Sequence, residues 1–542
     1  MTRTNKNLPT ASLDPKWLKW AIAISVALGA ILEVIDTSIV NVALPDMQSS
    51  LGATITEISW VITGYAISNV IIIPLTAWLG EQFGQKRYFI FSLVGFTISS
   101  VLCGFAPTLP FLIVSRILQG LCGGGLLAKA QAILFQTFPP EEQGTAQGVF
   151  GIGVIVGPAI GPTLGGYLTD TINWRWIFFI NIPFGILAVI MCWLFLPQDP
   201  QQKRQFSKID GERGVDFTRI SNRHVDWLGI SLLAIAVGSL QTFLEEGERD
   251  NWFDSSFIVT MAIVAAIGLG LFIWRELTAK QPAVNLRVLR HRSLAAGSFY
   301  SAVLGMGIYG AVFAIPIFAQ NVLNFTAMQT GMLLFPGAVA AGIMMPILGK
   351  LTSKIDPRLL IASGAIVTSL VMFQLAKINP DTGTEALFYP LLWRGVGMVL
   401  MFLPLSLATI GSLPKNDIPA GSGFYNLTRQ LGGSIGIAIL ATLLARREAF
   451  HRAILNDNVS LYNSATNQRL DALTSMFEGR GFDADTAHQQ ALAVISQTID
   501  LQSAILSFED IFHIVGIIFL VTLPLLLLLG KGDRNRVSRV VH

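Results

Sequence analysis

The sequence is poor in charge and in cysteine, and both shortages narrow the class of protein. Of its 542 residues, 13% are charged, about half the share of an ordinary globular protein. So little charge cannot cover the several soluble domains that a chain of this length would otherwise suggest. The three cysteines, Cys103, Cys122 and Cys192, all lie in apolar runs, so we predict no disulfide framework.

The sequence also lacks the motifs of several enzyme and pump classes. It has no HExxH pair, no Ser-His-Asp string and no cysteine and histidine set at metal-ligand spacing. A phosphate-binding loop is missing, because Gly349 and Lys350 are followed by Leu351 and not by a hydroxyl residue. We therefore predict no enzyme, cofactor or metal site, and any active transport must draw on an ion gradient. The net charge of +3 gives no reason to expect a nucleic-acid partner.

Long apolar runs take the place of the missing charge. Hydrophobic residues make up 52% of the chain, and a helix needs about 20 apolar residues to span a membrane. Residues 1–19 are polar and lead into a first span without a cleavable signal. The runs predict an all-α membrane protein with fourteen spans, whose approximate cores are 20–44, 58–79, 88–105, 112–135, 144–168, 177–196, 227–244, 257–274, 295–319, 330–348, 359–376, 386–410, 421–444 and 508–529.

The distribution of lysine and arginine orients these spans. If the N-terminus lies inside, the internal segments hold 25 of these residues and the short external loops hold two. Positive charge favours the cytoplasmic side. We therefore expect a multi-pass protein of the cell (inner) membrane with both termini in the cytoplasm.

The first six and the last six spans echo each other. Arg116 stands near the start of the fourth span and Arg394 at the matching place of the twelfth, and the fifth and thirteenth spans are both rich in glycine. Two six-helix halves with two inserted helices are typical of transporters. The expected division is an N-terminal six-helix bundle (1–196), a cytoplasmic linker with two inserted helices (197–294), and a C-terminal six-helix bundle with a long external loop at 446–507 (295–542).

Several short strings on these spans resemble the motifs of one transporter family. The strings begin at Glu33, Ser115, Gly153, Trp174 and Asp226. Together they resemble the major facilitator superfamily over essentially the whole chain, and the fourteen spans point to its EmrB/QacA-type drug:proton antiporters. The resemblance implies proton-coupled efflux of lipophilic, often cationic, compounds by alternating access. The alternative is an ion-coupled importer or exporter of a specific metabolite, because a fold does not fix the cargo or the direction.

An acidic pair in the first span is the candidate for proton coupling. Asp36 and Glu33 share one helix face in a span without other charge. An ionisable group within a membrane is costly and is a functional candidate by default. Counting a rise of about 1.5 Å per residue places Asp36 and Arg116 in the same outer half of the membrane, and the family resemblance links this arginine to proton coupling. The alternative is a static charge pair that tightens the bundle.

Other residues are candidates for conformational change. In the fifth span, small residues at every fourth position allow close packing, and two prolines each remove a backbone hydrogen bond. We expect a helix that packs closely and bends, although a tight static pair would look the same. The candidates in this span are Gly153, Gly157, Pro158, Gly161 and Pro162.

A charged turn between the second and third spans holds Glu81, Lys86 and Arg87. These side chains are expected either to latch the closed state or only to anchor the turn at the cytoplasmic face. The family loop usually carries an aspartate and an arginine where this chain has Glu81 and Gln82. Near the inner face, Lys129 is expected to snorkel to solvent.

Two further arginines, Arg394 and Arg429, lie deep in the spans of the second half. We expect them either to act in substrate binding or coupling, or only to bond one helix to another.

The external segment 446–507 is the last feature that needs an explanation. Its final part, from Ala484 to Leu506, has apolar residues at near-helical spacing and predicts an amphipathic helix that runs into the last span. We expect this helix to fold back as a cap over the C-terminal half. The alternative is a docking site for a periplasmic membrane-fusion adaptor, the partner that EmrB-type exporters use.

Overall fold

The computed structural model describes residues 16–197, 226–279, 281–352, 354–377, 384–460 and 462–529. Within these ranges it contains fourteen stretches of helix long and apolar enough to span a membrane, and no strand. The predicted all-α class and the number of spans are therefore confirmed. The predicted linker, residues 197–226, lies outside the described residues except at its two ends.

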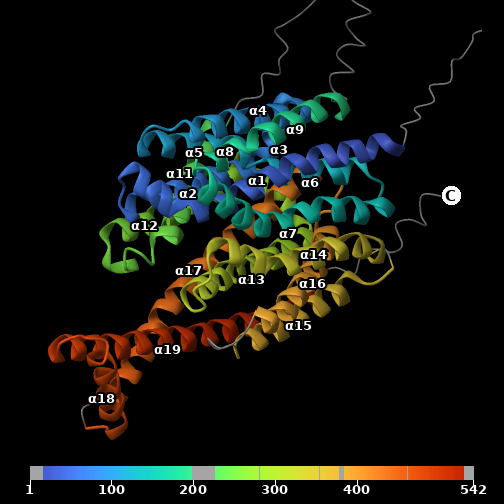
Figure 1. Ribbon diagram of the computed structural model, residues 1–542. Helices are drawn as coiled ribbons and strands as arrows, with labels where there is room; N and C mark the ends of the chain where they lie inside the picture. Colours follow the sequence, from blue (N-terminus) through green and yellow to red (C-terminus); the bar gives the residue numbers. More distant parts are fainter. Residues whose placement is uncertain are drawn as a thin grey trace, which may run out of the picture.

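Two bundles lie side by side in the molecule (Figure 1). The first bundle, here the N half, is built of α1 (Lys16–Leu51), α2 (Ile55–Ile72), η1 (Ile73–Leu75), α3 (Thr76–Phe83), α4 (Gln85–Gly104), α5 (Leu109–Gly123), α6 (Leu126–Thr137), α7 (Pro140–Thr171), α8 (Trp176–Phe179) and α9 (Asn181–Phe195). The second bundle, here the C half, is built of α13 (Arg292–Asn321), α14 (Ala327–Leu351), α15 (Pro357–Leu375), α16 (Thr384–Thr409), α17 (Ile418–Asn458), α18 (Ser464–Glu478), α19 (Ala484–Val521) and η5 (Leu523–Leu528).

Two of the spans in the N half are broken, and both breaks lie beside the candidate site. Pro74 interrupts the second span between α2 and α3, where it cannot donate a backbone hydrogen bond. The fourth span breaks at the glycines between α5 and α6. A Cβ at Gly124 would lie 2.6 Å from the backbone oxygen of Asn69, so only glycine lets these two broken spans approach so closely.

Two further spans, α11 (Trp227–Glu246) and α12 (Ser256–Thr278), are inserted between the halves and are joined by η3 (Trp252–Asp254). They pair with each other, and α11 also packs against α2 of the N half and α17 of the C half. Asp226 accepts a hydrogen bond from the backbone of Gly229 at the start of α11 and forms an ion pair of 3.1 Å with Arg275 of α12. After α12, η4 (Leu286–Arg290) leads into the C half.

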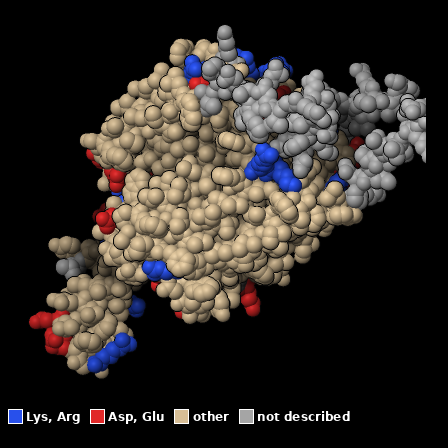
Figure 2. Space-filling view, turned by 90° about the horizontal axis from the view of Figure 1, so that it is seen from above, with Lys and Arg blue, Asp and Glu red and all other residues tan. Residues whose placement is uncertain are grey.

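The two ends of the bundle differ. We call the end at which α1 begins the α1 end, and the opposite end the hairpin end, because the last part of α17, α18 and the first part of α19 project from it (Figure 1). Figure 2 shows a face that is largely free of charge, with one basic patch on it and other charged side chains at its rims and on the projecting hairpin. This distribution fits a body buried in a membrane and a hairpin that stands in water.

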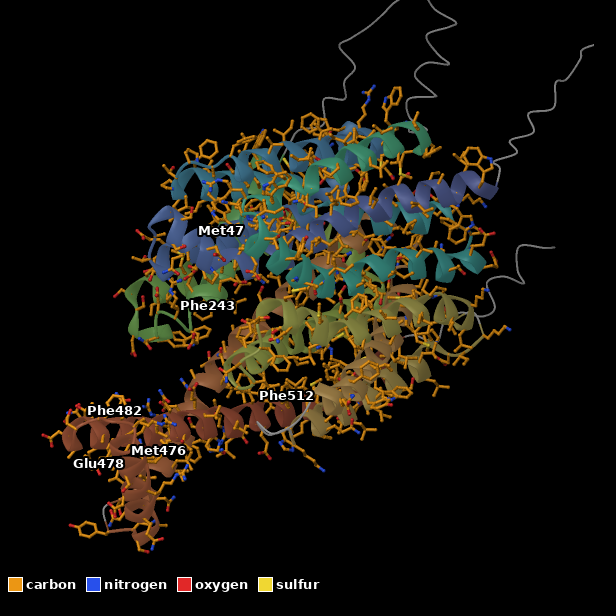
Figure 3. The ribbon with its side chains drawn as sticks, in the orientation of Figure 1. Met47, Phe243, Met476, Glu478, Phe482 and Phe512 are labelled. Atoms are coloured by element: carbon orange, nitrogen blue, oxygen red, sulfur yellow. The ribbon has the colours of Figure 1, made fainter. Side chains whose placement is uncertain are left out.

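The structure of the external segment contradicts the predicted cap over the C-terminal half. α19 runs unbroken from Ala484 to Val521, so the predicted continuation into the last span is confirmed. Its apolar face, however, is covered by α18, through a small cluster of Leu470, Leu473 and Ala491. Figure 3 shows Met476, Glu478 and Phe482 at the far end of the hairpin, away from Phe512, which lies where α19 enters the C half. In the described residues the segment projects from the C half and does not cover it, because α18 supplies a local partner for the amphipathic face.

Candidate functional site

A buried ion pair lies inside the N half. Arg116 of α5 places Nη1 2.6 Å from Asp36 Oδ2 of α1. The two side chains are 1% and 0% exposed, so the structure brings together the two residues that the sequence placed at the same depth. The guanidinium also stacks on the ring of Tyr65, 4.0 Å from its centroid, and Nε donates to the backbone oxygen of Val61. The cation is thus held by α1, α2 and α5 at once.

Neutral side chains complete the coordination of the carboxylate. Gln119 and Asn181 donate to Asp36 Oδ1 at 2.9 and 2.7 Å. Gln119 also accepts from Arg116 and donates to Ser100. Asn181 and Gln119 stood in the strings that carried the family resemblance, yet nothing in their spacing showed that they converge on one carboxylate. With both Asp36 oxygens bonded, the charged form is fully satisfied in this state.

Glu33 lies one turn before Asp36 in a different environment. Its carboxylate accepts from Asn69 Nδ2 at 3.0 Å and from the backbone nitrogen of Leu127 at 2.9 Å. Leu127 stands in the first turn of α6, where the helix dipole favours a negative charge. Arg429 of α17 lies within electrostatic range of Glu33, so this acid is influenced by a charge from the other half.

A polar seal joins the two halves toward the α1 end. Gln131 of α6 donates to Ser406 of α16 at 2.8 Å and accepts from Asn426 of α17 at 2.7 Å. Beside it, Ser422 of α17 donates to the backbone oxygen of Ala128 at 2.7 Å. Gln131 is fully buried, so no water replaces these bonds. Gln131 could not be predicted as a contact residue, since a lone glutamine in an apolar run gives no sign of its partner.

The glycine stripe of α7 packs against α1. A Cβ at Gly153 would lie 2.0 Å from Ile31, and one at Gly157 would lie 2.8 Å from Val34. The predicted close packing is therefore present, and its partner is the helix that carries Asp36 and Glu33. Gly161 lies equally close to Ser38, while Pro158 and Pro162 stand inside the continuous helix. Any bend of α7 must move against α1.

A second face of α7 packs across the boundary between the halves. A Cβ at Gly144 would lie 2.2 Å from the backbone oxygen of Gly349 on α14, and one at Gly331 of α14 would lie 2.1 Å from Thr163. The contact therefore runs from the α1 end to near the hairpin end. The sequence gives no sign of this second face, because its residues do not keep a single repeat.

The charged turn between α3 and α4 gives a mixed result. Lys86 donates to the backbone oxygens of Trp193 and Leu196, both at 2.7 Å. It thereby caps the C-terminal end of α9 within the N half and does not reach the C half. Glu81 and Arg87 are exposed at the same turn, and their gating role stays a prediction.

Lys129 departs from the expectation that it would snorkel to solvent. It is 2% exposed, and its Nζ lies against Gly80 near the end of α3, where a Cβ would come within 2.1 Å. The short approach of α3 and α6 buries the ammonium group.

The two arginines of the C half have different surroundings. Arg429 is 4% exposed, donates to Asn426 Oδ1 at 2.8 Å and lies over the ring of Phe402. It therefore belongs to the polar seal. Arg394, the counterpart of Arg116 in the internal repeat, has a buried Nη1 without a hydrogen-bond partner in the described part of the chain. The structure thus gives the C half no equivalent of the Asp36–Arg116 pair among the ion pairs of the described residues.

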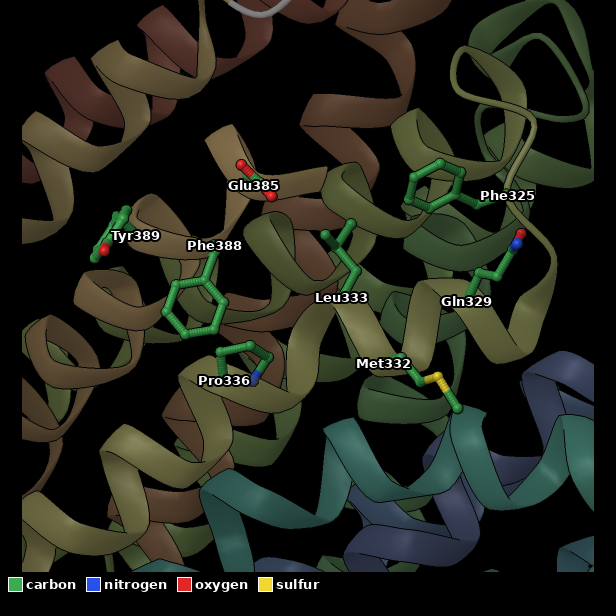
Figure 4. A pocket seen from close by; sticks show the side chains of 8 residues that line it. All are labelled: Phe325, Gln329, Met332, Leu333, Pro336, Glu385, Phe388 and Tyr389. Atoms are coloured by element: carbon green, nitrogen blue, oxygen red, sulfur yellow. The ribbon is translucent and has the colours of Figure 1, made fainter. Parts of the chain in front are cut away.

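A pocket of about 580 Å³ opens at the hairpin end of the C half, between α14 and α16 (Figure 4). Its lining is mostly apolar and aromatic, with one carboxylate: Phe325, Gln329, Met332, Leu333, Pro336, Glu385, Phe388 and Tyr389. Aromatic faces and a carboxylate suit a lipophilic cation. In the described residues no group of histidine, cysteine or acidic side chains could hold a metal ion.

Comparisons with known proteins agree with this architecture. The family model of the Major Facilitator Superfamily matches residues 26–437. The multidrug export protein EmrB of Escherichia coli strain K12 is 34% identical over 505 residues, which cover 93% of this chain and 94% of that protein. The fatty acid resistance protein FarB of Neisseria gonorrhoeae is 31% identical and covers 94% and 95%.

A solved structure supports the same fold. The human organic anion transporter MFSD10 (TETRAN) superposes with a TM-score of 0.59 at 13% identity, over 95% of this chain and 100% of that one. With a family match over most of the chain and relatives above 30% identity along nearly its whole length, the chain is a multi-pass membrane transporter of the Major Facilitator Superfamily, in the branch that holds the EmrB proteins.

Proposed function

We propose that the protein exports lipophilic, often cationic, compounds in exchange for protons, by alternating access of one path between its two halves. The observation that carries the proposal is the fully buried Asp36–Arg116 pair in the spanning region. A membrane protein keeps such a costly pair where its charge state changes during work. The names of EmrB and FarB, a multidrug exporter and a fatty acid resistance protein, support lipophilic cargo.

The proton step uses Asp36 first. When a proton binds to its carboxylate, the negative charge beside Arg116 disappears and one acceptor oxygen becomes a donor. Arg116 keeps Gln119 Oε1, the Val61 oxygen and the face of Tyr65, so the cation remains partly satisfied. Proton binding therefore loosens the tie between α1 and α5. Arg116 loses its counter-charge but keeps neutral hydrogen-bond acceptors, so the protonated state can form and release its proton again.

Glu33 connects proton binding to the opposite half. While it is charged it attracts Arg429, which is bonded to Asn426 of the polar seal. A proton on Glu33 removes that attraction and weakens the seal at the α1 end. We propose that Arg429 acts in this coupling and that Gln131 forms the gate. Bending of α7 along Gly157 and Pro158 then follows the movement of α1.

The orientation follows from the lysine and arginine counts. With more positive charge in the loops of the α1 end, we propose that this end and both termini face the cytoplasm of a cell whose inner membrane holds the protein. The polar seal then closes the cytoplasmic side of the path between the two halves. The pocket beside Glu385 lies on the outer side, where a cationic compound would leave.

The projecting hairpin supports the second reading of the external segment. It stands clear of the C half and exposes Phe450, Phe482 and Leu492. We propose that a periplasmic membrane-fusion adaptor binds there, because a segment that projects into water and exposes several large apolar side chains is suited to a protein contact.

Transport in vesicles tests the proposal. Purified protein in proteoliposomes is expected to move a fluorescent lipophilic cation against its gradient when a pH difference is imposed, in exchange for protons. Asp36→Asn serves as the inactive control. Dye movement that ignores the pH difference would argue against proton coupling. Movement of dye and protons in the same direction would favour the alternative, an ion-coupled importer.

A further inference from the structure

Two adjacent acids at the hairpin end of α11 have partners on opposite sides. Glu246 accepts from Thr63 of α2 at 2.8 Å and forms an ion pair with Arg249 at 3.1 Å. Glu245 accepts from Gln241 at 2.7 Å and from Ser434 of α17 at 3.4 Å. The C-terminal end of α11 therefore touches the N half through one carboxylate and the C half through the other.

Only one of the two acids has a cation. Glu246 is compensated by Arg249, whereas no ion pair in the described residues includes Glu245. Glu245 has neutral donors and a second carboxylate as its sequence neighbour. A carboxylate in a span with this surrounding is costly in its charged form, and a bound cation or a proton removes the cost.

Gln241, one helical turn before Glu245, has an acceptor oxygen that can take one more hydrogen bond. Gln241 is fully buried, and its Nε2 donates to both Glu245 and Ser434, at 2.7 Å each. The oxygen of the same amide has no hydrogen-bond partner among the described residues. A protonated Glu245 gains one O–H, and this orphan acceptor or the Ser434 oxygen can receive it. The cluster of Gln241, Glu245 and Ser434, here the α11 cluster, is therefore built to accept a proton.

In the part of the chain that the structure describes, no charged side chain around the α11 cluster neutralises Glu245 in place of a proton. α2 brings Glu57 and Tyr65, and α12 carries its charged residues, Arg275 and Glu276, at its opposite end beside Asp226. On α17 the cation before Ser434 is Arg429, which is bonded into the polar seal. These groups leave Glu245 without a dedicated counter-charge.

We propose that Glu245 is a third proton-binding carboxylate of the transport cycle, besides Asp36 and Glu33, placed where the inserted span α11 meets the C half. The bonds from Gln241 to Ser434 and from Trp252 to Thr442 cross this joint, at 2.7 and 2.9 Å. When the halves rotate, these contacts change, and so does the surrounding of Glu245. By linkage, a joint whose geometry alters the proton affinity is itself altered by the proton.

This inference rests on the proposed proton-coupled export, and the test separates the two. Substrate-induced proton release is measured on the full-length protein in weakly buffered detergent solution with a fluorescent lipophilic cation as the probe. Glu245→Gln, which mimics the protonated acid and keeps the bonds to its neighbours, is expected to lower the protons released per bound dye. Glu245→Asp is expected to retain release.

Glu246→Gln is the matched control. It changes a neighbouring carboxylate of the same helix end that already has a cation, and we expect unchanged proton release. Equal release by Glu245→Gln and the wild type would overturn the proposal and leave the proposed function intact. No release by the wild type would refute the proposed function itself. Normal release with at least tenfold weaker dye binding in Glu245→Gln would show that this acid holds the substrate cation instead, which also overturns it.

Discussion

Asp36 sits among three donors that come from two other helices, and this arrangement decides what its neutral form can do. Gln119, Asn181 and Arg116 all point at one carboxylate. Removing one member of a buried ion pair commonly costs about 3–5 kcal/mol, because the other charge is left uncompensated. Here neutral acceptors remain for Arg116, so an isosteric substitution should affect transport more than folding.

Asp36→Asn is expected to abolish pH-driven efflux while dye exchange without net proton movement persists. The asparagine keeps the shape and an acceptor oxygen but cannot carry the proton. Efflux and exchange of a fluorescent dye are measured in the same vesicles. Glu33→Gln is the companion variant and should lose less. Wild-type efflux by Asp36→Asn would exclude Asp36 from coupling.

Glu385→Gln is expected to weaken binding of a cationic dye and to leave binding of a neutral one unchanged. A partly exposed charge pair contributes up to about 1 kcal/mol, so the loss should be about threefold to fivefold. Fluorescence titration of both dyes measures it. The pocket would be excluded as a cation site if both affinities were equal to those of the wild type.

For single residues, the contact between the charged side chains Asp36 and Arg116 could be predicted from the sequence, but the neutral side chains that bond to them could not. The depth of Asp36 and Arg116 follows from counting helical rise, which is why their contact was expected. Gln131 and Asn426 come from helices almost 300 residues apart, and their bond depends on how two halves dock. Nothing local in the chain encodes that distance.

The helix α7 packs against α1 with one face and against α14 with another, and glycines allow the close approach on both faces. Gly157 touches Val34 within the N half, while Gly144 and Gly349 touch across the halves. A larger residue on either face separates helices that now touch backbone to backbone or backbone to side chain. The two faces should therefore respond differently to substitution.

Gly157→Leu is expected to lower the melting temperature and to impair transport, since overpacking costs about 1–3 kcal/mol. Gly270→Leu is the matched control, because a Cβ at Gly270 of α12 meets nothing within 4 Å. Both variants are compared by thermal unfolding in detergent. Equal melting temperatures for the two would show that the stripe tolerates a side chain.

Gln131→Ala is expected to open the α1 end more often. The substitution removes the hydrogen bonds to Ser406 and Asn426 and leaves their polar groups buried. Each unsatisfied group destabilises the closed state by about 1–3 kcal/mol. The distance between spin labels on α6 and α17 at the α1 end should show a larger population of the separated state. Gln136→Ala, which removes an exposed bond to the Lys415 backbone, is the control. An unchanged distance distribution would remove Gln131 from the gate.

Elements were predictable where periodicity and length alone decide them. The fourteen spans and the unbroken passage from Ala484 into the last span needed only hydropathy and spacing. The cap was wrong because α18, a mostly polar helix, hides Leu470 and Leu473 as its few apolar anchors. The weak amphipathic pattern of α18 does not show that this helix covers the apolar face of α19.

For the whole molecule, the hairpin has its own small core and is attached by a base of ion pairs. His451 and Arg447 contact Asp510, at 2.9 and 3.5 Å, and Arg452 contacts Asp500 at 3.0 Å. The tip is therefore separable from the membrane body.

Deleting residues 457–496 and joining α17 to α19 by a short linker keeps all three ion pairs of the base. We expect the isolated protein to retain its melting temperature and vesicle transport, while cells lose resistance and the adaptor no longer co-purifies. Replacing the same residues by an equally long Gly-Ser linker controls for chain length. A lower melting temperature in both variants would show that the hairpin stabilises the body.

The two helices that form the hairpin are also the longest in the described chain. α17 has 41 residues and α19 has 38, which at about 1.5 Å per residue gives each a length near 60 Å. Only about 30 Å of each can lie in hydrocarbon, so roughly half of each rod stands outside. A rod held along its buried half works as a lever. A tilt of the C half by about 10° would move the outer end of the hairpin by about 5 Å. A protein bound to the hairpin could therefore sense the conformation of the two halves without contacting the membrane body or any ligand.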